Sequence, residues 1–384
     1  MKENFLNKAI VIGVDHHNTL GIIRSLGERG VKVHAIILNC KTAYISYSRY
    51  LKEVMYVDSD SDLLRDLLVQ KYQNEEYKPV LIPSCDIAAL LLEKIKSKLA
   101  DLFVLGGCST DGGVAFYMNK LNLGMLARDL GICVPPMIVF EIDKNTSLDD
   151  LLSKLKNQQI RFPIIMKPLM SAENSKSAIV VVQKEDDMHS DSTLLKHGRY
   201  LIQEYINIEQ EYGLQGVSYA DEEKVVIPAI VQKIRTSDVA RGSTTYARLT
   251  NDISVIDVEK MKELVLSTGY SGIFDIELMQ SGDKIYLVEI NFRNGAYGYA
   301  YTKAGYNLPF EWYLHCIGRE NDEVEKKHKQ EITLISETAD FNHVRRGKIN
   351  IFSWLYQLLA ANVKMLWNLK DPTPFFAKLL KKHR

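Results

Sequence analysis

Two carboxylates and an amide oxygen stand on neighbouring segments of residues 274–298, FDIELMQSGDKIYLVEINFRNGAYG. Strand side chains alternate between faces, so Asp275 shares a face with Glu277, and Glu289 with Asn291. The short SGD turn predicts an antiparallel hairpin on which Glu277, Glu289 and Asn291 converge. Such oxygens among apolar neighbours suit Mg²⁺, which completes its shell with water and phosphate oxygens. The alternative is an exposed charged face with Glu277 paired to a lysine.

The residues that follow this hairpin, Arg293, Asn294 and Gly295, favour phosphate binding. The segment Glu289-Ile290-Asn291-Phe292-Arg293, with Glu277 upstream, resembles the metal-binding strand of the ATP-grasp superfamily. In that family, Glu-x-Asn precedes a basic, glycine-containing stretch. The resemblance implies ATP and Mg²⁺ as cofactors, with Mn²⁺ as the alternative ion. It assigns the metal to Glu277, Glu289 and Asn291, and a catalytic charge to Arg293.

Further segments match the family in order and spacing, so that the resemblance covers about residues 115–310. The stretch FPIIMKP, residues 162–168, places Lys167 where the family has a catalytic lysine on the α and β phosphates of ATP. Lys120 matches an earlier nucleotide-contacting lysine. The family's hinge, which holds adenine through backbone groups, and its ribose-binding glutamate match Gln203, Glu204, Tyr205, Ile206 and Glu211.

The loop after Lys167 departs from the family. Residues 169–177 contain no glycine, whereas the family usually has a glycine-rich loop whose amides close over the phosphates. The serine hydroxyls and Lys176 are the alternative contacts. Whether this loop closes is left open by the sequence.

Substrate contacts are expected at two places. Arg235 and Arg241 lie in a polar stretch, residues 232–250, and a guanidinium suits an incoming carboxylate; the alternative is a solvated loop. His16 and Asp86 follow apolar strands, where open α/β sheets bind ligands. The alternative for His16 is an ordinary turn residue.

Hydrophobic patterning predicts the elements that position these residues, in an α/β and α+β chain. Strands at 9–14, 31–38, 80–84 and 103–107 alternate with helices at 19–29 and 87–99, which indicates an open α/β domain. The resemblance identifies residues 1–115 as a pre-ATP-grasp domain. It implies a two-lobed ATP-grasp domain at 116–320, with a small lid lobe at about 120–200. Residues 321–384 are interpreted as a linker and an amphipathic, basic C-terminal tail.

Composition excludes several classes of protein. Lysine plus arginine equals aspartate plus glutamate at 48 each, so no net field favours nucleic acid as a partner. Five scattered cysteines fit neither a disulfide framework nor a zinc cluster. The apolar run near the N-terminus is too short for a signal peptide, so a cytoplasmic location is expected.

The C-terminal tail is basic and aromatic. Residues 320–345 are polar and indicate a surface linker, and from Arg345 to Arg384 nine lysines and arginines face one acid, Asp371. Residues 349–367 are typical of an amphipathic helix, too short and polar to span a membrane. Its apolar stripe comprises Ile351, Leu355, Leu358, Leu359, Met365 and Leu366. The helix either packs on the enzyme body or lies on the anionic inner face of a membrane.

The motifs together predict an ATP-dependent ligase that activates a carboxylate as an acylphosphate and joins it to an amine. Within the superfamily the chain is most similar to D-aspartate ligases and carbamoyl-phosphate-synthase-like ligases, which implies an amino acid substrate. Small-molecule carboxylates and amines are the expected partners, with a homodimer as one assembly. The alternatives are a carboxylase-type or kinase-type enzyme, and a non-catalytic ATP-binding scaffold.

Overall fold

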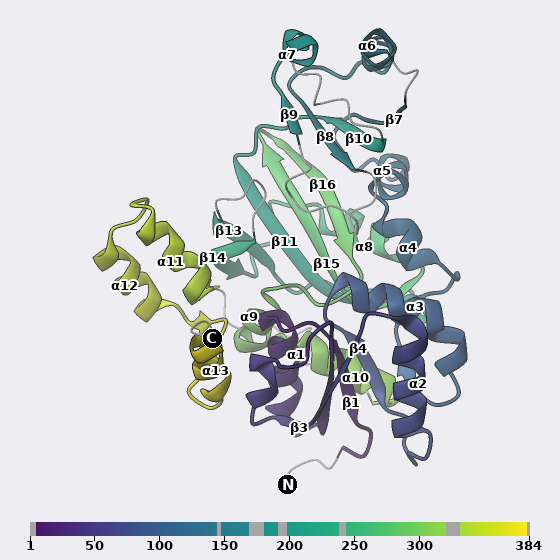
Figure 1. The fold of residues 1–384 in the computed structure, drawn as a ribbon, viewed down its shortest axis with the longest axis vertical. Coiled ribbons are helices and arrows are strands. Elements are labelled where there is room, and N and C mark those ends of the chain that lie inside the picture. Colours follow the sequence, from purple (N-terminus) through teal and green to yellow (C-terminus); the bar gives the residue numbers. More distant parts are fainter. Residues whose placement is uncertain are drawn as a thin grey trace. The chain divides into compact units, whose positions relative to one another are not determined.

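The computed structural model of the chain describes residues 5–143, 147–168, 180–190, 198–237, 243–319 and 331–381 (Figure 1). Contacts between residues divide the chain into two compact units. Unit 1 comprises Met1–Ala115, Tyr212–Ile276 and Ile290–Arg384. Unit 2 comprises Phe116–Glu211 and Glu277–Glu289. Each unit therefore joins segments that are far apart in the sequence.

Unit 1 begins with a parallel sheet whose strand order is β3-β2-β1-β4-β5. Alternate residues of β1 belong to two different hydrophobic cores, one shared with α1 and the other with α2 and α3. Since helices cover both faces, every residue of β1 is buried, as its continuous apolar sequence predicts. The expected open α/β domain is confirmed. Its elements are β1 (Ala9–Gly13), β2 (Val33–Leu38), β3 (Leu51–Val57), β4 (Val80–Pro83), β5 (Val104–Leu105), α1 (His17–Gly27), α2 (Ser61–Tyr72), α3 (Asp86–Leu99) and the 3-10 turn η1 (Tyr44–Tyr47).

A second sheet, with the order β16-β15-β11-β13-β14-β17-β18, is largely antiparallel; β12 pairs with β11, and β6 with β15. One hydrophobic core joins β13, β14 and β17 to α9, α10 and the α1 side of the parallel sheet. The strands are β6 (Gly107–Cys108), β11 (Gln210–Tyr219), β12 (Lys224–Val226), β13 (Ile230–Thr236), β14 (Thr244–Thr250), β15 (Tyr270–Ser281), β16 (Lys284–Asn291), β17 (Glu331–Ile335) and β18 (Val363–Lys364). The helices that accompany them are α8 (Val258–Ser267), α9 (Gly298–Ala304) and α10 (Leu308–Cys316).

The C-terminal part of the chain differs from the sequence-based prediction. Of the expected linker, residues 320–330 lie outside the described residues, but 331–345 form β17 and α11 (Glu337–Arg345). The prediction of a linker is wrong for residues 331–345, because Ile332, Leu334 and Ile335 are buried in a strand that pairs with β14. The tail helix, α12 (Ile351–Ala360), is shorter than predicted and is followed by β18. Met365 and Leu366 are buried rather than part of a helical stripe.

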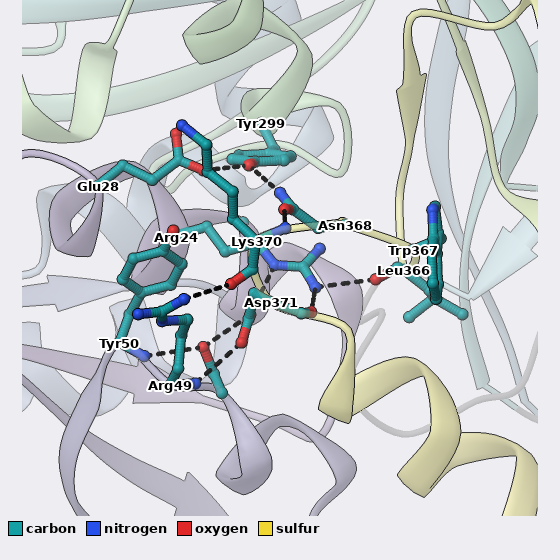
Figure 2. A network of polar contacts seen from close by, with 12 residues as sticks. Arg24, Glu28, Arg49, Tyr50, Tyr299, Leu366, Trp367, Asn368, Lys370 and Asp371 are labelled. Carbon is teal, nitrogen blue, oxygen red and sulfur yellow. Dashed lines mark hydrogen bonds and ion pairs between the residues drawn. The ribbon is translucent and has the colours of Figure 1, made fainter.

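A buried ion pair fixes the last segment of the chain to α1 (Figure 2). Arg24 Nε lies 2.9 Å from Asp371 Oδ2, and both side chains are fully buried at 0% exposure. Arg24 Nη2 also donates to the carbonyls of Leu366 and Asp371, at 2.8 and 2.9 Å. The Asp371 carboxylate accepts in addition from Ser48 Oγ and the Arg49 N–H. Beyond this anchor, α13 (Thr373–Lys381) packs against η1.

Unit 2 contains an antiparallel sheet with the order β7-β10-β8-β9. Leu151 and Leu155 of α6 pack on this sheet and close its core. A capping box between Ser147 and Asp150 begins α6, which satisfies backbone N–H groups at the start of the helix. The elements are β7 (Met137–Ile142), β8 (Ile164–Pro168), β9 (Val180–Val182), β10 (Gly198–Glu204), α5 (Lys120–Asp129), α6 (Leu148–Asn157) and α7 (Glu185–Ser190), while α4 (Gly113–Met118) spans the unit boundary.

No helix among the described residues is both long and apolar enough to cross a membrane.

Candidate functional site

The chemistry-bearing hairpin is present, since β15 and β16 are neighbours in one sheet. Gly282 turns the chain with φ +57°, a conformation that glycine adopts readily. Phe274, Ile276 and Leu278 are buried on one side of β15, while Glu277 on the other side is partly exposed. Asp275 and Asn291 are buried, and Asn291 Nδ2 lies 3.4 Å from Asp275 Oδ2. Asp275 and Asn291 therefore do face each other across the two strands.

Arg293, two residues after the end of β16, is held by two carboxylates from distant parts of unit 1. Its Nε lies 2.9 Å from Asp86 Oδ1, and its Nη1 lies 3.2 Å from Asp275 Oδ2. Tyr297 Oη donates to the second oxygen of Asp275 at 2.7 Å. The guanidinium is thus fixed at the end of β16 beside the first residue of α3. The structure brings together Asp86, Asn291 and Arg293, three of the residues selected from sequence.

Hydrogen bonds of backbone and side-chain amide groups stabilise the backbone next to Asp86, Asn291 and Arg293. Asn18 Nδ2 donates to the carbonyls of Ser84 and Asn294, and Asn294 Nδ2 returns a bond to Asn18 Oδ1 at 2.7 Å. Gly295 is required for close packing, because a Cβ there would lie 2.0 Å from Gln215 Nε2. Both polar atoms of the Gln215 side chain are buried without a hydrogen-bond partner among the described residues.

His16 and His17 lie at the end of β1, with ring centroids 3.8 Å apart. His16 caps α1, since its Nδ1 accepts from the Asn18 N–H. Burial, followed by the charges of Lys378 and Arg293, lowers the pKa of His16 to about 4, although Asp15 opposes the shift. Burial and His16 also lower the pKa of His17 well below its ordinary value. Both imidazoles are therefore neutral near pH 7, suited to hydrogen bonding rather than to charge pairing.

In unit 2, Lys120 and Glu289 form an ion pair. Asn119 caps α5, which places Lys120 at the first helical position, and Lys120 Nζ lies 3.0 Å from Glu289 Oε2. A residue predicted to touch the nucleotide and one predicted to bind the metal are therefore adjacent. Glu277 belongs to the same unit, whereas Asn291 belongs to unit 1, so their convergence stays a prediction.

Lys167 is buried on β8 and donates from Nζ to Gln203 Oε1 of β10 at 2.7 Å. The hinge follows at once. The Glu204 and Tyr205 N–H groups donate to the carbonyls of Pro136 and Pro163, and the Glu204 carboxylate accepts from the Arg161 N–H. These bonds fix the backbone that leads into Ile206. Glu211, the predicted ribose ligand, is partly exposed on β11.

Of the two arginines predicted to contact substrate, only Arg235 lies among the described residues. Arg235 binds Asp340 of α11 through two bonds of 3.0 and 2.7 Å and lies 4.3 Å from the Tyr246 ring centroid. This packing gives Arg235 a structural partner, and its contact with substrate stays a prediction. Arg241 and the glycine-free loop 169–177 lie outside the described residues. Among the described residues, no group of three histidine, cysteine, aspartate or glutamate side chains could hold a metal.

Sequence reasoning missed several side chains around this site. Asp275 was predicted to share a face with Glu277 but was given no role, although its spacing of two residues from Glu277 already places it on the side of the strand that carries the predicted site. Tyr44, with Lys378 Nζ 4.7 Å from its ring centroid, and Gln215 gave no signal, because their neighbours are distant in the sequence. A buried Tyr44 hydroxyl has no partner among the described residues.

The fold and the order of the site residues are those of an ATP-grasp domain. Residues 126–306 match the ATP-grasp domain family, so this part of the chain is an ATP-grasp domain. A curated relative is the N5-carboxyaminoimidazole ribonucleotide synthase of Synechococcus elongatus, 24% identical over 209 residues. The match covers 53% of this chain and 49% of that enzyme, so the chain spans about half the length of this relative.

Solved structures share the fold over most of the chain. The N5-carboxyaminoimidazole synthetase of Staphylococcus aureus has a TM-score of 0.66 at 16% identity, covering 90% of this chain and 88% of that one. The L-amino acid ligase of Bacillus licheniformis has a TM-score of 0.62 at 13% identity, covering 86% of this chain and 80% of that one. These likenesses establish the fold.

Proposed function

We propose that the chain is an ATP- and Mg²⁺-dependent carboxylate-amine ligase that acts through an acylphosphate. The observation that carries this proposal is the fixation of Arg293 by Asp275 and Asp86 at the end of β16. A guanidinium held in advance stabilises charge that develops on a phosphoryl or acyl oxygen without having to reorient. Its position two residues after the Glu-x-Asn strand supports a role at the reacting phosphate.

The donor set fits magnesium. Glu277, Glu289 and Asn291 offer carboxylate and amide oxygens, the ligands that this ion prefers. Strand alternation favours one face for Asp275 with Glu277 and for Glu289 with Asn291, and the contact between Asp275 and Asn291 supports it. Magnesium supplies neutralisation of phosphate charge when it is bound.

The other residues take roles in binding and orientation. Lys120, which lies beside Glu289, and Lys167, which Gln203 orients, offset the charge of the ATP phosphates. The backbone of residues 203–206 holds adenine, and Glu211 binds the ribose. His16 is neutral and hydrogen-bonds substrate beside Arg293, while Asp86 fixes Arg293 itself. Arg235 and Arg241 stay proposals for contact with a substrate carboxylate.

The proposed reaction has two steps. A carboxylate oxygen of the substrate attacks the γ-phosphorus of ATP, which forms the acylphosphate and releases ADP. The amine nitrogen then attacks the acyl carbon, the C–O bond to phosphate breaks, and the nitrogen loses a proton. An amino acid is the proposed carboxylate, supported by the fold shared with an L-amino acid ligase.

Hydroxylamine trapping tests the proposal. The full chain is incubated with ATP, Mg²⁺, hydroxylamine and single amino acids, and hydroxamate and ADP are measured. Arg293→Gln is expected to reduce hydroxamate formation about a hundredfold, as for loss of a preorganised charge. Arg65→Gln is the matched control, because Arg65 also binds two carboxylates, Asp62 and Asp66, but on α2. Its activity should equal that of the wild type.

Two results contradict the proposal. Release of ADP with bicarbonate, and with no amino acid, indicates the carboxylase alternative. Binding of ATP without turnover on any carboxylate, equal in the wild type and Glu289→Gln, indicates the non-catalytic scaffold.

A further inference from the structure

An exposed apolar stripe runs along α12, which contains no charged residue. Phe352, Leu355, Tyr356 and Leu359 stand at positions i, i+3, i+4 and i+7, and are 77%, 41%, 74% and 79% exposed. Helical residues at this spacing share one face. A helix on a solvated surface ordinarily turns polar residues outward. In α12 the large apolar side chains face outward instead.

The opposite side of α12 is anchored to unit 1. Trp354 is buried against Phe341 of α11, with ring centroids 5.0 Å apart, and its Nε1 donates to Asp340 Oδ2. Figure 1 shows α11 and α12 side by side. Trp354, which lies outside the stripe predicted from the sequence, therefore attaches α12 to the protein body, while Phe352, Tyr356 and Leu359 face outward.

The apolar surface continues beyond the stripe. A groove of about 580 Å³ is lined by residues of α11, α12, the segment after β18, and α13, among them Trp354, Leu358, Leu359, Trp367, Phe375 and Leu379. Leu359 belongs to both the stripe and the groove. On α13, Phe376 and Leu380 are also exposed, one helical turn apart. A contiguous patch of this kind marks an interaction surface more often than scattered exposed residues do.

Positive charge is concentrated in the same part of the chain as this patch. From Arg345 to Arg384 the chain carries nine lysines and arginines and one acid, in a protein whose formal net charge is zero. That acid, Asp371, is buried against Arg24. The acids of α11 nearest the groove are also engaged, since Glu337 accepts from the Leu366 and Trp367 N–H groups, and Asp340 from Arg235. Arg345, Arg346 and Lys348 are exposed at the turn before α12.

We propose that this surface docks on an anionic phospholipid membrane, with the stripe of α12 among the acyl chains and Arg345, Arg346 and Lys348 against the phosphates. Apolar residues beside basic ones supply the two signals that peripheral membrane binding requires. A second copy of the chain is a poorer occupant, because a symmetric contact would place two cationic patches against each other. The proposal does not depend on the ligase activity, and its test requires none.

Flotation with lipid vesicles tests the docking. The full chain is mixed with vesicles of phosphatidylcholine alone, or of phosphatidylcholine and phosphatidylglycerol in equal amounts. We expect flotation with the anionic vesicles, weakened by salt. The triple variant Phe352→Ser/Tyr356→Ser/Leu359→Ser should lower partitioning by roughly a hundredfold or more, since each large apolar side chain contributes about fivefold to tenfold. Neutralising Arg345, Arg346 and Lys348 to glutamine should lower it by about fivefold per residue on anionic vesicles alone.

A matched variant controls for loss of apolar surface in general. Phe116→Ser/Tyr77→Ser/Leu63→Ser removes the same three residue types from exposed positions outside the patch. It should float like the wild type. Equal flotation of the wild type and the stripe variant, including none by either, overturns the proposal. A second result also overturns the proposal. If the wild type is dimeric, the stripe variant is monomeric and neither binds vesicles, the patch is an interface between copies of the chain.

Tryptophan quenching gives a second measurement that needs no substitution. Trp354 and Trp367 line the groove, whereas the remaining tryptophan, Trp312, is buried in the central core of unit 1. Vesicles with brominated acyl chains should quench a large part of the emission, and unbrominated vesicles should not. Unchanged emission in samples that float contradicts insertion of the α12 face.

Discussion

Removal of Arg24 should destabilise unit 1 more than any surface change. Its guanidinium makes bonds of 2.9, 2.8 and 2.9 Å to Asp371 Oδ2, Leu366 O and Asp371 O, with a longer one of 3.4 Å to Met365 O. Arg24→Met leaves the Asp371 carboxylate buried without its cation and three carbonyls without a donor. Breaking one partner of a buried pair costs about 3–5 kcal/mol, so we expect a loss of that size in the free energy of unfolding.

Asp371→Asn should also destabilise unit 1, because Ser48 Oγ and the Arg49 N–H donate to different carboxylate oxygens and the single oxygen of an amide can keep only one of these bonds. The double variant should be more stable than the sum of the two losses predicts, by about 2 kcal/mol, since each change removes the same interaction. Urea unfolding followed by tryptophan emission reports unit 1 selectively, because Trp312, Trp354 and Trp367 all belong to it.

Arg65→Met is the control for the charge itself. Arg65 also contacts two aspartates, but on the surface of α2, where such pairs contribute about 0–1 kcal/mol. A loss below about 1 kcal/mol in Arg24→Met, or additive losses in the double variant, would refute the reasoning that this pair anchors the C-terminal segment.

Further predictions concern pH, packing and nucleotide. The His16 pKa is about 4 when folded and 6.5 unfolded, so the stability present above pH 6.5 falls as the pH drops toward 4, by about 3 kcal/mol. Urea unfolding across this range should show a smaller fall in His16→Gln. Gly295→Ala should lower the unfolding free energy by about 1–3 kcal/mol and reduce turnover, because the new Cβ meets Gln215 and Asp275; unchanged melting and activity would contradict this. Lys167→Met should weaken ATP binding by roughly tenfold or more in calorimetry, since a charged hydrogen bond is lost.

The sequence indicated the elements whose pattern is local. The β1 strand is apolar throughout because both faces are covered, and the β15 to β16 hairpin has an alternating pattern with a glycine turn. The strand β17 was missed, since its buried residues Ile332, Leu334 and Ile335 adjoin a long charged run. The end of α12 at Ala360 was missed because the apolar spacing continues past it.

Contacts between residues that are far apart in the sequence could not be predicted, because they leave no local sequence pattern. Arg24 and Asp371 are 347 positions apart, and each looks like an ordinary surface charge in its local segment. Arg235 was predicted to contact substrate because its neighbours are polar, and the structure adds a partner, Asp340 of α11, that the sequence did not indicate. Such a partner can be found only when the element that carries it is known, and α11 lies in a stretch that was predicted to be a linker.

The C-terminal segment links the two proposals physically. Asp371 holds the start of this segment to α1, and α13 then packs on η1 with Lys378 over the Tyr44 ring. Burial is the main cause of the low pKa of His16, and the charge of Lys378 adds to it, so the segment that carries the proposed membrane surface also affects the pKa of a proposed substrate contact.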